Sequence, residues 1–183
     1  PILDEIDTQE IYEGMNLSID LLATDIDSND LLYSASSDDS NISIIINNNN
    51  LTLSFIDENW YGSTIISASV SDGELFSNRN FELNVLPVND APVLSNINDT
   101  SINEDSFFLY SLSALDIDSD YLIFSSQTES DNLDINISGN LLTVTPNENY
   151  FGEEEITVLV SDGELSNTET FMLQVLPVND RPI

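Results

Sequence analysis

The chain has 183 residues, of which 34 are Asp or Glu and only 2 are Lys or Arg, so its formal net charge at pH 7 is −32. A chain with so little positive charge offers no surface for a phosphate backbone or an anionic membrane, which excludes nucleic acid as a partner. No stretch approaches the ~18 consecutive apolar residues of a membrane span, which predicts no membrane insertion in this fragment. Because the sequence contains no His and no Cys, it also lacks an imidazole base, a thiol nucleophile, a disulfide and the usual ligands of zinc.

Apolar and polar residues alternate along the chain in the pattern of half-buried β-strands. Segment 80–85 reads Asn-Phe-Glu-Leu-Asn-Val, and segment 170–175 repeats the pattern as Thr-Phe-Met-Leu-Gln-Val. Turns are predicted at Asn47–Asn50 and at Ser138–Asn140, where they would join neighbouring strands into hairpins. In chain order the predicted strands are 16–22, 31–36, 41–46, 51–55, 63–71 and 80–85, followed by 106–112, 122–127, 133–137, 142–145, 155–161 and 170–175.

The chain contains an internal repeat. Leu86-Pro87-Val88-Asn89-Asp90-Ala91-Pro92 returns as Leu176-Pro177-Val178-Asn179-Asp180-Arg181-Pro182, and Asn59-Trp60-Tyr61-Gly62 returns as Asn149-Tyr150-Phe151-Gly152. We therefore predict a first module at 1–91 and a second at 92–183, joined by a short linker that its prolines make stiff. With a first strand added near each start, the fold class is all-β: two tandem seven-stranded immunoglobulin-like β-sandwiches. The repeat also leads us to expect that the fragment belongs to a longer array.

Carboxylates are the main candidates for chemistry. The strings Asp25-x-Asp27 and Asp116-x-Asp118 place like charges at alternate positions of a loop, where they repel one another unless a cation or water intervenes. The loop is not an EF-hand, because its sixth and twelfth positions hold Asp30 and Ser36 instead of Gly and Glu. A glycosidase also uses paired carboxylates, but a pair duplicated in two successive modules argues against that reaction. We expect no catalytic residues and no enzyme activity.

Three segments carry a resemblance to a known family. Ala23-Thr24-Asp25-Ile26-Asp27-Ser28 resembles the Asp-x-Asp loop of cadherin repeats, Val70-Ser71-Asp72-Gly73 resembles their Ala-x-Asp-Gly segment, and Val88-Asn89-Asp90-Ala91-Pro92 resembles their linker. The chain is most similar to the cadherin-like tandem repeats of bacterial surface adhesins, and the similarity covers both modules. Two features depart from the family pattern: Pro87 replaces the first linker Asp, and no Asn follows Asp90.

The resemblance implies that Ca²⁺ binds at the junction between modules, and carboxylate and amide oxygens are the ligands that this hard cation accepts. The departures in the linker put a full set of three ions in doubt. The implied junction ligands are Glu13, Glu58, Asn89, Asp90, Asp116, Asp118 and Asp162, and the implied half-sites at the two outer ends are Asp25, Asp27 and Asp72, and Glu104, Glu148, Asn179 and Asp180.

Other readings of the acidic residues and aromatic side chains stay open. General acidity is also an adaptation to salt, in which the charge serves only solubility. Trp60 could stack on a sugar, although aromatic residues beside a glycine at a strand start are more often core. Our hypothesis is a calcium-rigidified extender or adhesion module of a large bacterial protein, secreted or on the cell surface, whose partners are neighbouring repeats, and cell-surface proteins or polysaccharide. The alternative is a carbohydrate- or partner-binding accessory module of an exported enzyme.

Overall fold

The computed structural model describes residues 1–179. It divides into two compact units, Pro1–Val88 and Asn89–Ile183, so the division falls slightly earlier in the linker than the predicted boundary after Ala91. Every regular element within residues 1–179 is a β-strand. None of these residues forms a helix of the length and hydropathy needed to cross a bilayer.

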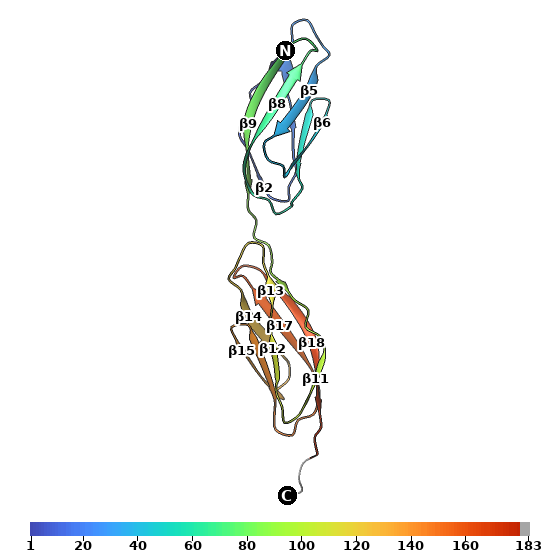
Figure 1. Cartoon of the computed structure of the whole chain (residues 1–183), viewed down its shortest axis with the longest axis vertical. Helices are drawn as coiled ribbons and strands as arrows, with labels where there is room; N and C mark the ends of the chain where they lie inside the picture. The colour runs from blue at the N-terminus through green and yellow to red at the C-terminus, as the bar shows by residue number, and fades with distance from the viewer. Residues whose placement is uncertain (180–183) are drawn as a thin grey trace. The chain divides into compact units, whose positions relative to one another are not determined.

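The first unit is a sandwich of a four-stranded and a three-stranded sheet (Figure 1). The larger sheet has the order β2-β9-β8-β5, the smaller has the order β3-β7-β6, and β1 pairs with β4. Only the β2–β9 pair is parallel. The strands are β1 (Ile2–Leu3), β2 (Gln9–Tyr12), β3 (Leu17–Asp20), β4 (Ala23–Thr24), β5 (Leu32–Ser37), β6 (Ile42–Asn47), β7 (Asn50–Phe55), β8 (Gly62–Ser71) and β9 (Phe76–Leu86).

The second unit repeats this topology strand for strand. Its sheets have the orders β11-β18-β17-β14 and β12-β16-β15, with β10 paired to β13, and again one pair, β11–β18, is parallel. The strands are β10 (Val93–Leu94), β11 (Thr100–Asn103), β12 (Phe108–Ser111), β13 (Ala114–Leu115), β14 (Ile123–Gln127), β15 (Leu133–Ser138), β16 (Leu141–Pro146), β17 (Gly152–Ser161) and β18 (Ser166–Leu176).

Each unit has nine strands where the sequence predicts about seven. The difference arises near the start of each unit, where the chain first forms a two-residue strand that pairs with another two-residue strand, and then joins the four-stranded sheet. In the first unit β1 pairs antiparallel with β4, and after residue 8 the chain continues as β2, parallel to β9. Two-residue strands such as β1 and β4 leave little trace in a sequence pattern, because they show no alternation.

The alternating residues of the long hairpins form the core of each unit. In the first unit Ile66 on β8 lies opposite Phe81 on β9, and both are buried, as is Leu83, which has no exposed surface. In the second unit Ile156 lies opposite Phe171 in the same way. Replacing a fully buried leucine of this kind with alanine costs about 2–5 kcal/mol. Each unit therefore has its own hydrophobic core.

Both predicted hairpin turns are present. Asn47 pairs with Asn50, and the turn between them places Asn48 at a φ of 56°, a left-handed conformation that asparagine tolerates better than most residues. In the second unit Ser138 pairs with Leu141, and Gly139 has a φ of 62°. These turns set the register of β6 against β7 and of β15 against β16.

Candidate metal sites

The first of the two Asp-x-Asp loops follows β4 and is shaped by the side chain of Asp25. One carboxylate oxygen, Oδ1, accepts the backbone N–H of Asp27 at 3.0 Å and that of Ser28 at 2.9 Å. Ser28 stabilises the next turn, because its hydroxyl accepts the N–H of Asp30. This Asx turn engages Oδ1 and leaves Oδ2 available for another partner.

The second loop follows β13 and has the same geometry. Asp116 Oδ1 accepts the N–H of Asp118 at 2.8 Å and that of Ser119 at 2.9 Å. The Ser119 hydroxyl accepts the N–H of Tyr121. Ser28 and Ser119 were not among the predicted site residues, although both directly follow Asp-x-Asp and this repeated position indicates a role in the loop.

A second aspartate approaches each loop from the hairpin between the two longest strands. In the first unit this is Asp72, between β8 and β9, whose Oδ1 accepts the N–H of Glu74 at 2.8 Å and of Leu75 at 2.7 Å. These two backbone donors, Leu75 first, lower the pKa of Asp72. Asp162 occupies the same place between β17 and β18.

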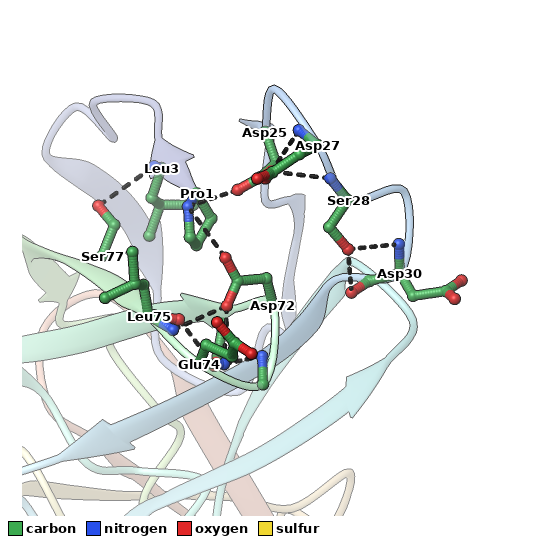
Figure 2. Close-up of polar contacts among 12 residues, drawn as sticks. Pro1, Leu3, Asp25, Asp27, Ser28, Asp30, Asp72, Glu74, Leu75 and Ser77 are labelled. Carbon is green, nitrogen blue, oxygen red and sulfur yellow. Dashed lines mark hydrogen bonds and ion pairs between the residues drawn. The ribbon is translucent and has the colours of Figure 1, made fainter.

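A positive charge lies within the acidic residues of the first unit. We call Asp25, Asp27 and Asp72 the Asp25 cluster. The Pro1 ammonium is 2.6 Å from Asp25 Oδ2 and 3.8 Å from Asp72 Oδ2, and Figure 2 shows its nitrogen between the two carboxylates. Its hydrogen bond, followed by the backbone N–H groups of Asp27 and Ser28, holds the pKa of Asp25 far below its ordinary value.

The charge on Asp25 affects its neighbours in turn. A side-chain hydrogen bond with Asp25, together with the negative charge on that residue, raises the pKa of Asp27. The same carboxylate raises the pKa of the Pro1 ammonium. Two carboxylates, Asp25 and Asp27, are therefore crowded together in the Asp25 cluster.

In the second unit, residues of the linker donate hydrogen bonds to the corresponding aspartates. We call Asp116, Asp118 and Asp162 the Asp116 cluster. Asn89 donates its side-chain N–H to Asp162 Oδ2 at 2.8 Å, and Asp90 donates its backbone N–H to Asp118 Oδ2 at 2.7 Å. The Asn89 amide, followed by the N–H groups of Glu164 and Leu165, lowers the pKa of Asp162.

Each unit also carries a buried glutamate at the start of the turn after its parallel strand. Glu13 and Glu104 are each 7% exposed. The Oε1 atom of Glu13 accepts the N–H of Val88, and Glu104 accepts the N–H of Val178 in the same way. A buried carboxylate thus holds the main chain just before each Asn-Asp pair.

Two predicted ligands carry a buried oxygen with no hydrogen-bond partner among the described residues: Glu13 Oε2 and Asp116 Oδ2. A buried carboxylate oxygen without a partner costs roughly 1–3 kcal/mol, so such an atom calls for a cation or a water. The donors are all carboxylate and amide oxygens, which fits Ca²⁺. Within residues 1–179, however, no three acidic side chains are gathered closely enough to hold a metal ion.

The remaining predicted ligands lie in less defined positions. Glu58 is exposed. Its backbone carbonyl oxygen would lie 3.8 Å from a Cβ placed on Gly14, so Glu58 is close to the turn that follows Glu13. Glu148 and Asn179 are exposed as well, and Asp180 lies outside the described residues. The structure thus links Asp25 with Asp72 through Pro1, and Asp118 with Asp162 through Asn89-Asp90, while the role of Glu58 and Glu148 stays a prediction.

Trp60 does not present a platform for a sugar. It is half-buried, stacks on Phe55 with ring centroids 5.8 Å apart, and packs against the core of the first unit. Its counterpart Tyr150 also packs against the core of its own unit and donates a hydrogen bond to Glu154. Burial, followed by that hydrogen bond, raises the pKa of Tyr150 to about 12. Both aromatic residues therefore serve packing.

Comparisons with known proteins agree with the fold. Residues 89–174 match the family model of the bacterial Ig domain. No curated protein matches the chain at a significant level. Among solved structures, human protocadherin-24 EC1-2 aligns with a TM-score of 0.53 and 20% identity, over 96% of this chain and 95% of that one. These findings confirm the predicted all-β immunoglobulin/cadherin-like sandwiches.

Two further structures resemble the chain more loosely. Titin domains z1z2 in complex with telethonin align with a TM-score of 0.42 and 14% identity, over 97% of this chain and 96% of that one. An endo-fucoidan hydrolase from glycoside hydrolase family 107 aligns with a TM-score of 0.41 and 19% identity, over 96% of this chain but only 28% of the enzyme.

Proposed function

We propose that the chain is an extender or adhesion module of a secreted or cell-surface bacterial protein, and that Ca²⁺ bound at its acidic clusters stiffens it. One observation carries the calcium part: Asp116 Oδ2 is buried without a hydrogen-bond partner among the described residues. A cation bound by this loop would give that oxygen a partner. We propose no catalytic role for either cluster.

The residues that would hold the ion come from the ends of the strands. Asp116, Asp118 and Asp162 would supply carboxylate oxygens, and the linker would add the side-chain oxygens of Asn89 and Asp90. Because the acidic side chains are too far apart to hold a metal ion as they stand, binding has to draw them together. The ion would supply the positive charge that relieves their repulsion.

The sequence also predicts Glu13 and Glu58 as ligands, and this stays a prediction. It is supported by the buried Oε2 of Glu13, which has no partner within the described residues. Glu13 binds Val88, and the next residue along the chain, Asn89, binds Asp162. An ion that fixed Asn89 and Asp90 would leave the linker few free torsions, since Pro87 already restricts it.

Thermal unfolding with and without Ca²⁺ tests the proposal against salt adaptation. At a free Ca²⁺ concentration ten times Kd, one site that exists only in the folded state adds about 1.4 kcal/mol to the free energy of unfolding. We expect Tm to fall on chelation even in concentrated NaCl, where screening acts over only about 3 Å. If NaCl fully replaced Ca²⁺, the charge would serve solubility and the calcium proposal would fail.

Small-angle X-ray scattering tests the stiffening. Each unit has its own core, so we expect both to stay folded after chelation while the linker becomes more mobile. Adding Ca²⁺ should narrow the distribution of maximum dimensions, and Mg²⁺, which demands tighter octahedral geometry, should not replace it. A scattering profile that Ca²⁺ leaves unchanged would contradict an extender stiffened by calcium.

A further inference from the structure

The two hairpins that carry Asp72 and Asp162 each contain an Asp-Gly bond. In a flexible chain this bond is chemically labile, because glycine has no side chain to shield its amide nitrogen. That nitrogen attacks the carbon of the protonated Asp carboxyl group. An N–Cγ bond forms, and the carboxyl hydroxyl leaves together with the amide proton as one water molecule, which gives a cyclic succinimide. Water then opens the ring, and opening at the main-chain carbonyl yields isoaspartate, with one extra methylene in the backbone.

The attacking nitrogen is held by a serine that precedes the aspartate. In the first unit Gly73 donates its N–H to Ser71 Oγ at 3.1 Å. The Ser71 hydroxyl donates its own proton to the Leu75 carbonyl oxygen at 2.9 Å, so its lone pairs face Gly73. The second unit repeats both contacts, with 3.0 Å from Gly163 N to Ser161 Oγ and 2.8 Å from Ser161 Oγ to Leu165 O.

The carboxyl group under attack is held as well. Asp72 Oδ1 accepts the N–H groups of Glu74 and Leu75, which lie beyond the glycine, and Figure 2 shows these two contacts. Ring closure needs the carboxyl carbon to turn back to the Gly73 nitrogen, which would break both bonds. Asp162 is held by Glu164 and Leu165 at 2.7 Å each.

Glycine is needed here for its backbone conformation. Gly73 has a φ of +97° and Gly163 a φ of +110°, values that residues with a side chain rarely adopt. A Cβ at either position would meet nothing within 4 Å, so space is not the reason. The turn therefore cannot exchange its glycine for a shielding residue without strain, and the labile bond comes with the fold.

We infer that Asp72-Gly73 and Asp162-Gly163 are latent isomerisation sites, and that Ser71 and Ser161 keep them unmodified in the folded chain. The reaction needs only water, so no further reactant is required. Its product would lengthen a tight hairpin and displace the carboxylate from the N–H groups that it now accepts. The inference does not depend on metal binding.

Isoaspartate formation in aged protein tests the inference. Native chain and the double variant Ser71→Ala/Ser161→Ala are incubated folded, at neutral pH and 37 °C, with a chelator so that no ion contributes. Isoaspartate is measured by enzymatic carboxyl methylation and located by mass spectrometry. We expect the double variant to isomerise about five- to ten-fold faster at both bonds, the ratio that losing one hydrogen bond allows.

Two controls separate the serine hydroxyl from general loosening of the fold. Ser69→Ala changes a serine on the same face of β8 two residues earlier, and should age like the native chain. Ser71→Thr/Ser161→Thr keeps the hydroxyl, and should return the rate to the native value even if the alanine variant is less stable. Equal rates in the native chain and the alanine variant, or a threonine variant as fast as the alanine one, would overturn the inference.

Discussion

The Asp25 and Asp116 clusters have the same backbone frame but different occupants. In both, the first aspartate uses Oδ1 to accept two backbone N–H groups, at distances between 2.8 and 3.0 Å. In the first unit the Pro1 nitrogen lies 2.6 Å from the remaining oxygen of Asp25. In the second unit the linker reaches Asp118 and Asp162, and the remaining oxygen of Asp116 is buried without a partner among the described residues.

In both units the loop fixes the position of the first carboxylate, while the partner of its second oxygen differs. Backbone N–H groups bind Oδ1 of the first aspartate in both units. The Oδ2 atom of Asp25 lies beside the Pro1 nitrogen, and the Oδ2 atoms of Asp118 and Asp162 accept N–H groups from the linker. Neutral linker donors bind Asp118 and Asp162, whereas Oδ2 of Asp116 has no partner among the described residues. A divalent cation would satisfy all three at once, which is the physical basis of the calcium proposal.

The largest effect should come from removing the unpartnered carboxylate. Asp116→Ala deletes a charged ligand and its Asx turn, so we expect Ca²⁺ affinity to fall about ten-fold or more. Asp120→Ala is the matched control, because it removes the same charge from the same loop at an exposed position. Titration of both variants by NMR would show the contrast. If the two lost affinity equally, total charge and not the cluster would determine binding.

The linker offers a second comparison, between Asp90 and its repeat partner Asp180. Asp90 donates its own N–H to Asp118, whereas Asp180 lies outside the described residues. We expect Asp90→Ala to weaken the tightest Ca²⁺ site about ten-fold and Asp180→Ala to change it little. Equal calorimetric titrations for the two variants would mean that each unit binds its ion alone.

Replacing the Asn89 amide with a carboxylate should make the stability of the protein depend more strongly on Ca²⁺. In Asn89→Asp the donor to Asp162 becomes a second negative charge, so the chelated protein should unfold at a lower temperature than the native chain. With Ca²⁺ the extra charged ligand should bind the ion, and the stabilisation by Ca²⁺ should exceed that of the native chain. If Asn89→Asp lowered the unfolding temperature by the same amount with and without Ca²⁺, no ion would be bound at Asp162.

The smallest effect should be the pH dependence at Asp162. Its pKa is lowered from 3.8 by the Asn89 amide and two backbone N–H groups. A lowered folded-state pKa stabilises the fold above the ordinary pKa, and this is lost as the pH falls through the lowered value. The Tm difference between the native chain and Asp162→Asn should therefore be present at pH 7 and shrink below pH 4. Asp134→Asn, at an exposed position on β15, should show no such trend.

The alternating pattern predicted the long strands, because their inward residues had to be apolar. Segment 80–85 is indeed part of β9, with Phe81, Leu83 and Val85 buried. The two-residue strands β1 and β4 were not predicted, since two residues show no alternation, although Leu3 of β1 is buried in the core. The repeat and the family resemblance named Asp25, Asp72, Asp116 and Asp162, but no pattern indicates which oxygen is engaged. That depends on loop geometry, which the structure supplies.

Calorimetric titration of the chelated native chain with Ca²⁺ in concentrated NaCl would show whether the acidic clusters bind calcium specifically. If the acidic clusters are calcium sites, the heat should saturate with a Kd of about 10⁻⁴–10⁻³ M, the range of extracellular modules, and Mg²⁺ at the same concentration should produce much less heat. Heat that does not saturate, or that disappears entirely in NaCl, would show that the carboxylates only attract a diffuse ion atmosphere and would contradict the account.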